Sequence, residues 1–234
     1  MSLFRFKEFQ ISQSESAMKV GTDGVLLGAW VDIEAEDRRL LDIGTGTGVI
    51  ALMLAQRAPE ATIWGVDIES VEEARRNGEL SPWGERLHFE QSPVQEFEAE
   101  PFDLILSNPP FFVESLRCPD HGRTMARHAV ALPFEALRDA VVRLLKPEGR
   151  FALVLPTDEA ARFEQIAQGV LRPIRRTRVR TTPRHPAKRC LLEFVHEASE
   201  RVAEPDRELM IGTGEHETYT EEYRTLTRDF YLKF

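Results

Sequence analysis

Cysteine is scarce in this sequence, and long hydrophobic runs are absent. The only cysteines among the 234 residues, Cys118 and Cys190, lie far apart without CxxC spacing, which argues against a disulfide framework and a zinc site. No stretch of roughly 18 apolar residues occurs, so we expect no transmembrane helix. The aromatic and charged N-terminal residues do not resemble a secretory signal. We therefore expect a cytoplasmic protein that binds no metal and does not associate with a membrane.

Strand and helix patterns alternate along most of the chain, and its 42% apolar residues can bury a sizeable core in one domain. Strands are expected at Arg39–Ile43, Thr62–Val66, Arg86–Phe89, Phe102–Ser107 and Arg150–Leu155. Helices are expected at Val49–Arg57, Ser70–Gly78, Pro133–Leu145 and Asp158–Leu171, with a helix stop and turn at Lys146–Gly149. This alternation predicts an α/β fold with a mostly parallel sheet covered on both faces, whose ligands bind at the carboxyl ends of the strands.

Two further patterns occur in the C-terminal part of the chain. Arg175–Arg180 and Cys190–His196 can pair as a β-hairpin, and Thr218 with Glu221 predicts a T-x-x-E capping box that starts a helix. Apolar side chains then recur at helical spacing, which indicates a helix docked on the core. These residues are Tyr219, Tyr223, Leu226 and Phe230.

A glycine-rich turn follows the first expected strand, within Asp42–Gly48. Glycines are needed where the backbone turns tightly and a ligand approaches closely, and the helix beyond offers free N–H groups. The dinucleotide pattern G-x-G-x-x-G is not met, because Val49 stands where the third glycine belongs. A negative charge at Asp42 is awkward for a pyrophosphate but favours a ligand that carries a sulfonium and an amino group. Asp67, nineteen residues after Gly48, ends the next strand and can accept hydrogen bonds from ribose hydroxyls.

Asn108–Phe111, with the sequence NPPF, follows a buried apolar strand and carries the most information. The exocyclic amine of adenine is a poor nucleophile, because its lone pair is delocalised into the ring. The side-chain oxygen of Asn108 and the carbonyl of Pro109 can each accept one N–H of that amine, and Phe111 can stack on the base. The plainer interpretation is a turn that ends a strand, since Asn-Pro favours turns.

A basic stripe runs from Arg172 to Arg189, with eight Lys or Arg side chains and no acid. The rest of the chain carries 22 basic and 39 acidic residues, a net charge of −17. A local basic stripe on an acidic body can direct a polyanion to one face, although ordinary solvated arginines on a strand and loop explain it equally well. Its members are Arg172, Arg175, Arg176, Arg178, Arg180, Arg184, Lys188 and Arg189.

On these motifs the chain resembles class I methyltransferases that use S-adenosylmethionine to methylate the N6 amine of adenine. More narrowly, nearly the whole chain is similar to the bacterial tRNA1(Val) adenine-37 N6-methyltransferase family. The similarity to that family also includes Phe4–Phe9, Ala17–Trp30, Ser81–Trp83 and Tyr219–Leu232.

The resemblance implies a doubly wound, mostly parallel seven-stranded sheet with an antiparallel last strand. It also implies a division into an N-terminal cap (residues 1–38) and a methyltransferase domain (residues 39–234). S-adenosylmethionine is the implied cofactor. The cofactor-binding residues it suggests are Asp42, Gly44, Thr45, Gly46, Gly48, Asp67, Ile68, Val94 and Asn108. The catalytic residues it suggests are Asn108, Pro109, Pro110 and Phe111.

One position departs from the related enzymes, which usually place an acidic residue after the third strand to bind the adenine amine of the cofactor. Pro93 occupies that place here and has no side-chain acceptor. Ser92, a backbone carbonyl or no group at all takes over that contact, and we expect the cofactor's adenine to be held mainly by the Val94 N–H and apolar contacts.

The implied partner is tRNA, bound by a protein that we expect to be a monomer. His128 follows the motif and is tempting as a base, but a structural histidine is the commoner case. Two interpretations of Arg123 and Arg127 stay open: they contact phosphate of the substrate, or they pair with acids on the protein surface. The substrate-binding candidates are Lys19, Thr22, Asp23, Phe112, Arg123, Arg127, Arg176, Arg178, Arg184 and Lys188.

Two alternatives stay open. One is N6-adenine or N5-glutamine methylation of rRNA, DNA or a protein, because a glutamine amide also presents a planar NH₂ group. The other is a non-catalytic RNA-binding or dinucleotide-binding module.

Overall fold

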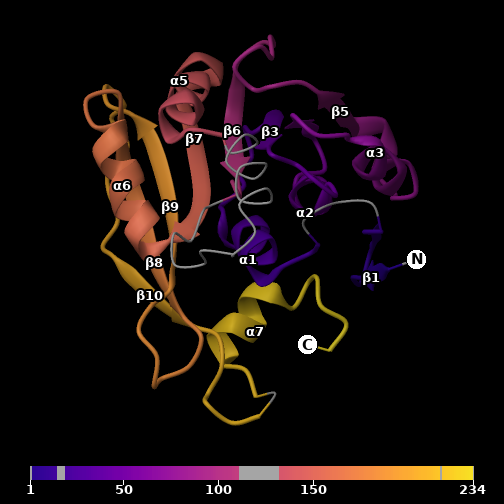
Figure 1. Ribbon diagram of the computed structural model, residues 1–234, viewed down its shortest axis with the longest axis vertical. Helices are drawn as coiled ribbons and strands as arrows, with labels where there is room; N and C mark the ends of the chain where they lie inside the picture. Colours follow the sequence, from indigo (N-terminus) through magenta and orange to yellow (C-terminus); the bar gives the residue numbers. More distant parts are fainter. Residues whose placement is uncertain (1, 15–18, 111–131, 217, 234) are drawn as a thin grey trace, which may run out of the picture.

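The computed structural model describes residues 2–14, 19–110, 132–216 and 218–233, and it contains one large twisted sheet with helices on both faces (Figure 1). The eight strands lie in the order β10-β8-β9-β7-β6-β3-β4-β5. Only β9 runs antiparallel to its neighbours, β7 and β8. The strands are β3 (Arg39–Ile43), β4 (Thr62–Asp67), β5 (Leu87–Gln91), β6 (Phe102–Ser107), β7 (Leu145–Pro156), β8 (Leu171–Arg180), β9 (Arg189–His196) and β10 (Arg207–Met210). The predicted α/β fold with a mostly parallel sheet is confirmed.

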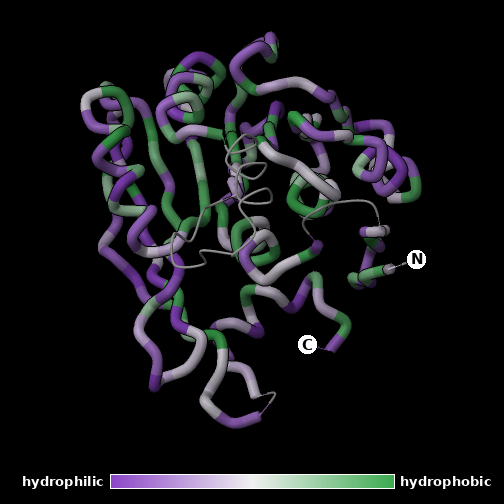
Figure 2. Tube along the Cα trace, in the orientation of Figure 1, coloured by the Kyte–Doolittle hydropathy of each residue, from purple (hydrophilic) through white to green (hydrophobic). Residues whose placement is uncertain are grey.

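Two buried apolar clusters lie on opposite faces of this sheet. Leu40 and Leu41, neighbours on β3, belong to different clusters because side chains alternate along a strand. Figure 2 shows apolar positions concentrated along the central strands. On one face α1 packs on α2 and α7, and on the other α5 packs on α6. The helices are α1 (Thr22–Trp30), α2 (Val49–Arg57), α3 (Glu72–Glu79), α5 (Phe134–Leu144), α6 (Thr157–Ala167) and α7 (Glu221–Thr227), with the 3₁₀ turn η1 (Gly84–Arg86).

The elements nearest the predicted ligand site have the expected bounds, since β3, β6 and α2 begin and end at the predicted residues. The hairpin of β8 and β9 is also confirmed. The predicted helix over Asp158–Leu171 is wrong at its end, because α6 stops at Ala167 and Leu171 already belongs to β8.

The number of strands is the main correction to the sheet. A seven-stranded sheet was expected, but β10 adds an eighth strand parallel to β8, at the edge. Lys146–Gly149 also do not form a separate turn, because β7 already begins at Leu145. Phe102 of β6 pairs with Leu145 of β7, but Leu104 pairs with Arg150, so the register shifts and Lys146–Gly149 form an irregularity within the strand pair.

The N-terminal residues contain more structure than the motifs predicted. A two-stranded antiparallel sheet of β1 (Leu3–Arg5) and β2 (Gln10–Ser12) precedes α1. Ile11 and the apolar residues of α1 join the same cluster as α2 and the sheet. α1 approaches α2 closely at Gly28, where an added Cβ would lie 2.9 Å from Sδ and 3.2 Å from Cβ of Met53. The division at residue 38 stays a prediction.

The last helix is docked on the core as predicted, with Tyr223 and Phe230 buried. The predicted capping box is wrong: the N-cap is Thr220, whose hydroxyl accepts the N–H of Tyr223 at 3.2 Å. Thr218 instead bonds within the preceding turn, and its neighbour Tyr219 forms a β-bridge with Gly212. None of the helices in the described ranges is long and apolar enough to cross a membrane.

Candidate active site

Three motifs that lie far apart in the sequence meet at one edge of the sheet. β3 lies between β4 and β6 and runs parallel to both. The glycine loop follows β3, Asp67 ends β4, and Asn108 follows β6, so all three lie at carboxyl ends of adjacent strands. The predicted convergence of these motifs is confirmed, in the place where open α/β sheets bind ligands.

The three glycines of the loop all have positive φ, at +74° for Gly44, +51° for Gly46 and +81° for Gly48. A Cβ built on Gly44 or Gly46 meets no atom within 4 Å, so the loop has open space in front of it. At Gly48, which caps α2, an added Cβ would lie 3.3 Å from side chains of Leu52 and Phe89. The first two glycines therefore leave room for a ligand, and the third permits close packing.

Asp42 lies beneath the loop with no exposed surface. Its Oδ2 accepts the Thr45 hydroxyl at 2.8 Å, and its Oδ1 has no hydrogen-bond partner among the described residues. Burial raises the pKa of Asp42 to about 7, and the nearby charge of Asp67 adds to the rise while the Thr45 hydroxyl opposes it. Asp42 is thus an under-solvated acid that a cationic ligand above the loop would favour in its charged form.

Asp67 is tied to the loop by its carboxylate. Oδ2 accepts the N–H of Gly46 and Oδ1 accepts the N–H of Glu69, both at 2.9 Å. A carboxylate has about four acceptor positions, so two remain for ribose hydroxyls. Ile68, the next residue, is 53% exposed and offers an apolar surface beside them, which suits an adenine ring.

The segment after β5 contains Pro93, in the place where the related enzymes usually have an acidic residue. The Ser92 hydroxyl donates to the carbonyl of Pro93 at 3.2 Å, which leaves its oxygen able to accept. Val94 is buried, its carbonyl accepts from Arg143 at 2.9 Å, and its N–H has no acceptor among the described residues. The Val94 N–H that we expect to bind the adenine is thus available, and Ser92, one of the alternatives for the missing acceptor, keeps an oxygen able to accept.

Asn108 is half-buried at the carboxyl end of β6. Its Oδ1 is a buried atom without a hydrogen-bond partner among the described residues. Its Nδ2 lies on the side of α1, where a Cβ built on Gly24 would be 3.7 Å away. Pro109 is buried and Pro110 is exposed. An unpaired buried acceptor is costly, so its presence at the carboxyl end of β6, next to β3 and its glycine loop, points to a donor supplied by a ligand.

These residues fit S-adenosylmethionine. The open space before Gly44 and Gly46 admits its amino acid end, with Asp42 beneath as the counter-charge. Asp67 would hold the ribose, and Ile68, Ser92 and Val94 would hold the adenine.

The basic stripe is not the unpaired run of charge that the sequence suggested. Arg176 pairs with Glu164 at 2.5 Å and with Asp206, and Arg178 pairs with Asp206 at 3.0 Å. Arg175 pairs with Asp32 and Glu193, Arg180 with Glu208, and Arg189 with Asp23, while Arg172 donates to the carbonyls of Ser199 and Arg201. The prediction that the stripe has no counter-charges was wrong, because acidic residues from other segments of the chain pair with most of its arginines.

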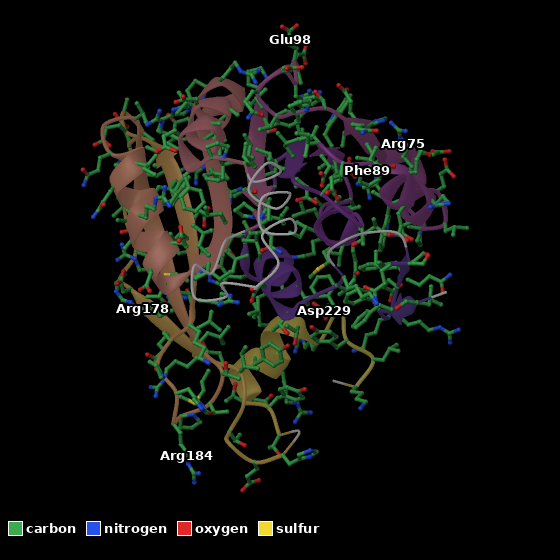
Figure 3. The ribbon with its side chains drawn as sticks, viewed as in Figure 1. Arg75, Phe89, Glu98, Arg178, Arg184 and Asp229 are labelled. Carbon is green, nitrogen blue, oxygen red and sulfur yellow. The ribbon has the colours of Figure 1, made fainter. Side chains whose placement is uncertain are left out.

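Two members of the stripe differ from the rest. Arg184 and Lys188 lie exposed in the loop between β8 and β9, without an ion pair to any described residue. Figure 3 shows Arg184 at the far tip of this loop and Arg178 back on the strand. Arg172 also forms no ion pair with a described residue, but its guanidinium donates to two backbone carbonyls. The exposed Arg184 and Lys188 therefore make this loop the part of the stripe that suits a polyanion.

The other substrate-binding candidates are only partly placed. Lys19 and Thr22 are exposed at the start of α1, and Asp23 is held by Arg189 at 2.7 Å. The remaining candidates lie outside the residues that the structure describes: Phe111, Phe112, Arg123, Arg127 and His128.

Sequence reasoning missed Asn77, a buried residue of α3. Its Nδ2 donates to the carbonyls of Thr47 in the glycine loop and Ser12 on β2, and its Oδ1 accepts the N–H of Ser12 at 2.8 Å. Asn77 thereby joins the loop to the N-terminal hairpin. No sequence signal marks it, since an asparagine in a polar helix ordinarily faces solvent.

Comparison with known proteins agrees with this geometry. The model of a methyltransferase domain matches residues 34–176. A solved structure described as a predicted O-methyltransferase from Agrobacterium tumefaciens is 19% identical, covers 89% of this chain and 96% of its own, and has a TM-score of 0.69. A class I S-adenosylmethionine-dependent methyltransferase from Listeria monocytogenes, 14% identical, covers 82% and 63% with a TM-score of 0.54. These structures show the fold.

Relatives at higher identity show the family. A Flavobacterium johnsoniae protein is 45% identical over 99% of this chain and 100% of its own length, and one from Bacteroides thetaiotaomicron is 44% identical over 98% and 97%. Both are named tRNA1(Val) (adenine(37)-N6)-methyltransferase. With the cofactor loop and the Asn108 motif at one edge of the sheet, the chain belongs to the tRNA1(Val) (adenine(37)-N6)-methyltransferase family of class I, S-adenosylmethionine-dependent enzymes.

Proposed function

We propose that this protein transfers a methyl group from S-adenosylmethionine to the N6 amine of an adenosine in tRNA, namely adenosine 37, next to the anticodon of a valine tRNA. The observation that carries the proposal is the buried, unpaired Oδ1 of Asn108 at the carboxyl end of β6, beside the glycine loop. The names of relatives at about 45% identity support the choice of tRNA. A tRNA substrate supports a cytoplasmic location, where we expect the protein to act as a monomer.

The chain's own groups account for activation of the amine. Asn108 Oδ1 and the Pro109 carbonyl each accept one N–H, which orients the amine and draws its lone pair out of the ring. The bound cofactor supplies a methyl group made electrophilic by its sulfonium. In the transfer, the amine nitrogen would gain the methyl group as the C–S bond of the cofactor breaks, and the proton lost by the amine would leave to water. Asn108 would orient the amine and the glycine loop would hold the cofactor, and this positioning would supply much of the rate.

A base in a folded RNA must be turned outward to reach this edge of the sheet. Anticodon-loop adenosines are partly unstacked, so the energetic cost of exposing one is low. This favours a loop adenosine over one within a duplex.

The test is methyl transfer from labelled S-adenosylmethionine to total tRNA that lacks this modification, followed by nucleoside mass analysis. We expect N6-methyladenosine in one valine tRNA, and a loss of at least a hundredfold in rate for Asn108→Ala, comparable to the loss of one preorganised polar group in an active site. Cofactor binding by that variant, measured by calorimetry, should change little. Normal turnover of Asn108→Ala would remove the mechanism, and label in rRNA or in protein glutamine would remove the tRNA assignment.

A further inference from the structure

A cavity lies at the same edge of the sheet as Asn108, where the strands parallel to β6 end. It has a volume of about 580 Å³ and lies beside the ends of β8 and β10. Its apolar lining includes Leu26 of α1, Val179 of β8 and Ile211, which follows β10. Nothing in the proposed chemistry uses this cavity, which we name the tyrosine pocket for the residues of its wall.

Aromatic rings from both ends of the chain line the tyrosine pocket. The ring centroids of Tyr219 and Tyr223 are 5.4 Å apart, and those of Tyr223 and Tyr231 are 6.5 Å apart. Phe4 of the N-terminal hairpin meets Tyr231 edge-on at 6.4 Å. Tyr219 is 40% exposed, so part of this residue faces solvent at the pocket. Flat, partly exposed aromatic faces stack on nucleobases without regard to sequence.

Positive charge gathers around the same cavity, although the whole chain carries a net charge of −9. Among the described residues, Arg5, Lys188, Arg189 and Lys233 line it, against one acid, Asp23. Asp23 is already paired with Arg189. Arg5, Lys188 and Lys233 are exposed and form no ion pair with a residue that the structure describes. An apolar, aromatic wall with a cationic rim is complementary to a nucleotide, which combines a stacking base with a phosphate.

The tyrosine pocket is within reach of an RNA held at Asn108. In the sheet order, β6 and β8 are separated by β7 and β9, or three spacings of ~4.8 Å, about 14 Å in all. The start of α1 lies between the two places: Thr22 and Asp23 line the pocket, and the next residue, Gly24, faces Asn108. A few nucleotides of single strand can cover that distance.

We propose that the tyrosine pocket binds one nucleotide of the RNA substrate outside the target adenosine, with its base on Tyr219 and its phosphate at Lys188 and Arg5. This inference rests on the proposed RNA-methylating function and names a second contact through which that substrate is held. The pocket raises the affinity for RNA and takes no part in cofactor binding.

The experiment measures the KM and the Kd for unmodified tRNA, the latter by fluorescence anisotropy, together with the Kd for S-adenosylmethionine. Tyr219→Ala should raise the tRNA Kd and KM about tenfold, the loss expected for one base stack, and Tyr219→Phe should keep the wild-type values. Lys188→Ala should weaken tRNA binding and lower the slope of log Kd against log salt by about one. All three variants should bind the cofactor normally. Arg162→Ala removes an exposed arginine of α6, on the opposite face, and serves as the matched control.

The outcomes separate the two proposals. If the wild-type protein methylates tRNA while Tyr219→Ala and Lys188→Ala keep its Kd and KM, the pocket is not an RNA site and the proposed function stands. If the wild-type protein methylates no tRNA, the proposed function falls and the pocket loses its ligand. Lys188 is exposed and its side chain has no ion pair in the described chain, so Lys188→Ala tests the pocket even if Tyr219→Ala fails to fold.

Discussion

Replacing Asp42 by asparagine should change how the stability of the protein depends on pH. Burial raises the pKa of Asp42 from 3.8 to about 7, so the folded protein holds a proton there that the unfolded chain has lost. Between the unfolded and the folded pKa, only the folded state binds this proton, so the free energy of unfolding falls by about 1.4 kcal/mol for each pH unit. It levels off above the folded pKa. This contribution is complete below pH ~4 and lost above pH ~7, a total on the order of 4 kcal/mol.

The measurement is urea unfolding followed by tryptophan fluorescence at pH 5.5 and 8.5, without cofactor. Over this range the Asp42 contribution falls by about 2 kcal/mol, because only the part between pH 5.5 and 7 remains to be lost. Asp42→Asn keeps a group that can accept the Thr45 hydroxyl and has nothing to titrate. Relative to wild type it should therefore gain about 2 kcal/mol between the two pH values.

Asp103→Asn is the matched control. Although burial opposes it, the Lys146 side chain and the N–H groups of Arg38 and Arg39 lower the pKa of Asp103. Asp103 is thus ionised in both states from pH 5.5 upward, and its removal should shift stability equally at both pH values. If Asp42→Asn shows the same pH difference as wild type, the carboxylate is not destabilised by burial and the reasoning is wrong.

Three further predictions follow from the same geometry. The affinity for S-adenosylmethionine, measured by calorimetry, should rise by at most about tenfold per pH unit up to pH ~7, because the cationic ligand favours ionised Asp42. In Asp42→Asn the affinity should depend less on pH. A variant whose affinity changes with pH as in wild type would contradict this prediction. Gly48→Ala should lower the free energy of unfolding in urea by about 1–3 kcal/mol and weaken cofactor binding, because φ of this residue is +81° and the added Cβ is crowded. Unchanged stability would show that the loop relaxes. Arg150→Met should cost about 3–5 kcal/mol in the same assay, since it removes the cation paired with buried Asp37 and leaves buried Glu193 with Arg175 alone. A neutral result would show that water reaches these acids.

Local signals predicted the elements that build the cofactor site. The loop after β3, the acid that ends β4 and the Asn108 motif after β6 each lie within a few residues of the strand that positions them. The parallel arrangement then brings all three to one edge, so their convergence was predictable from their order along the chain.

What only the tertiary structure decided are the contacts between residues distant in sequence. The basic stripe seemed unpaired because its acids, such as Asp32, Glu164 and Asp206, come from other elements. The N-cap of the last helix is Thr220 rather than Thr218, because the Thr220 hydroxyl also donates to the carbonyl of Met210 at the end of β10.

The tyrosine pocket has the same origin. Phe4 and Tyr231 stand near opposite ends of the chain, and no periodicity along the sequence relates them. The sequence alone thus determined the fold class and the convergence of the glycine loop, Asp67 and Asn108, because those signals are local or follow from strand order. Charge pairing, the strand at the sheet edge and the second pocket depend on which distant side chains folding brings together.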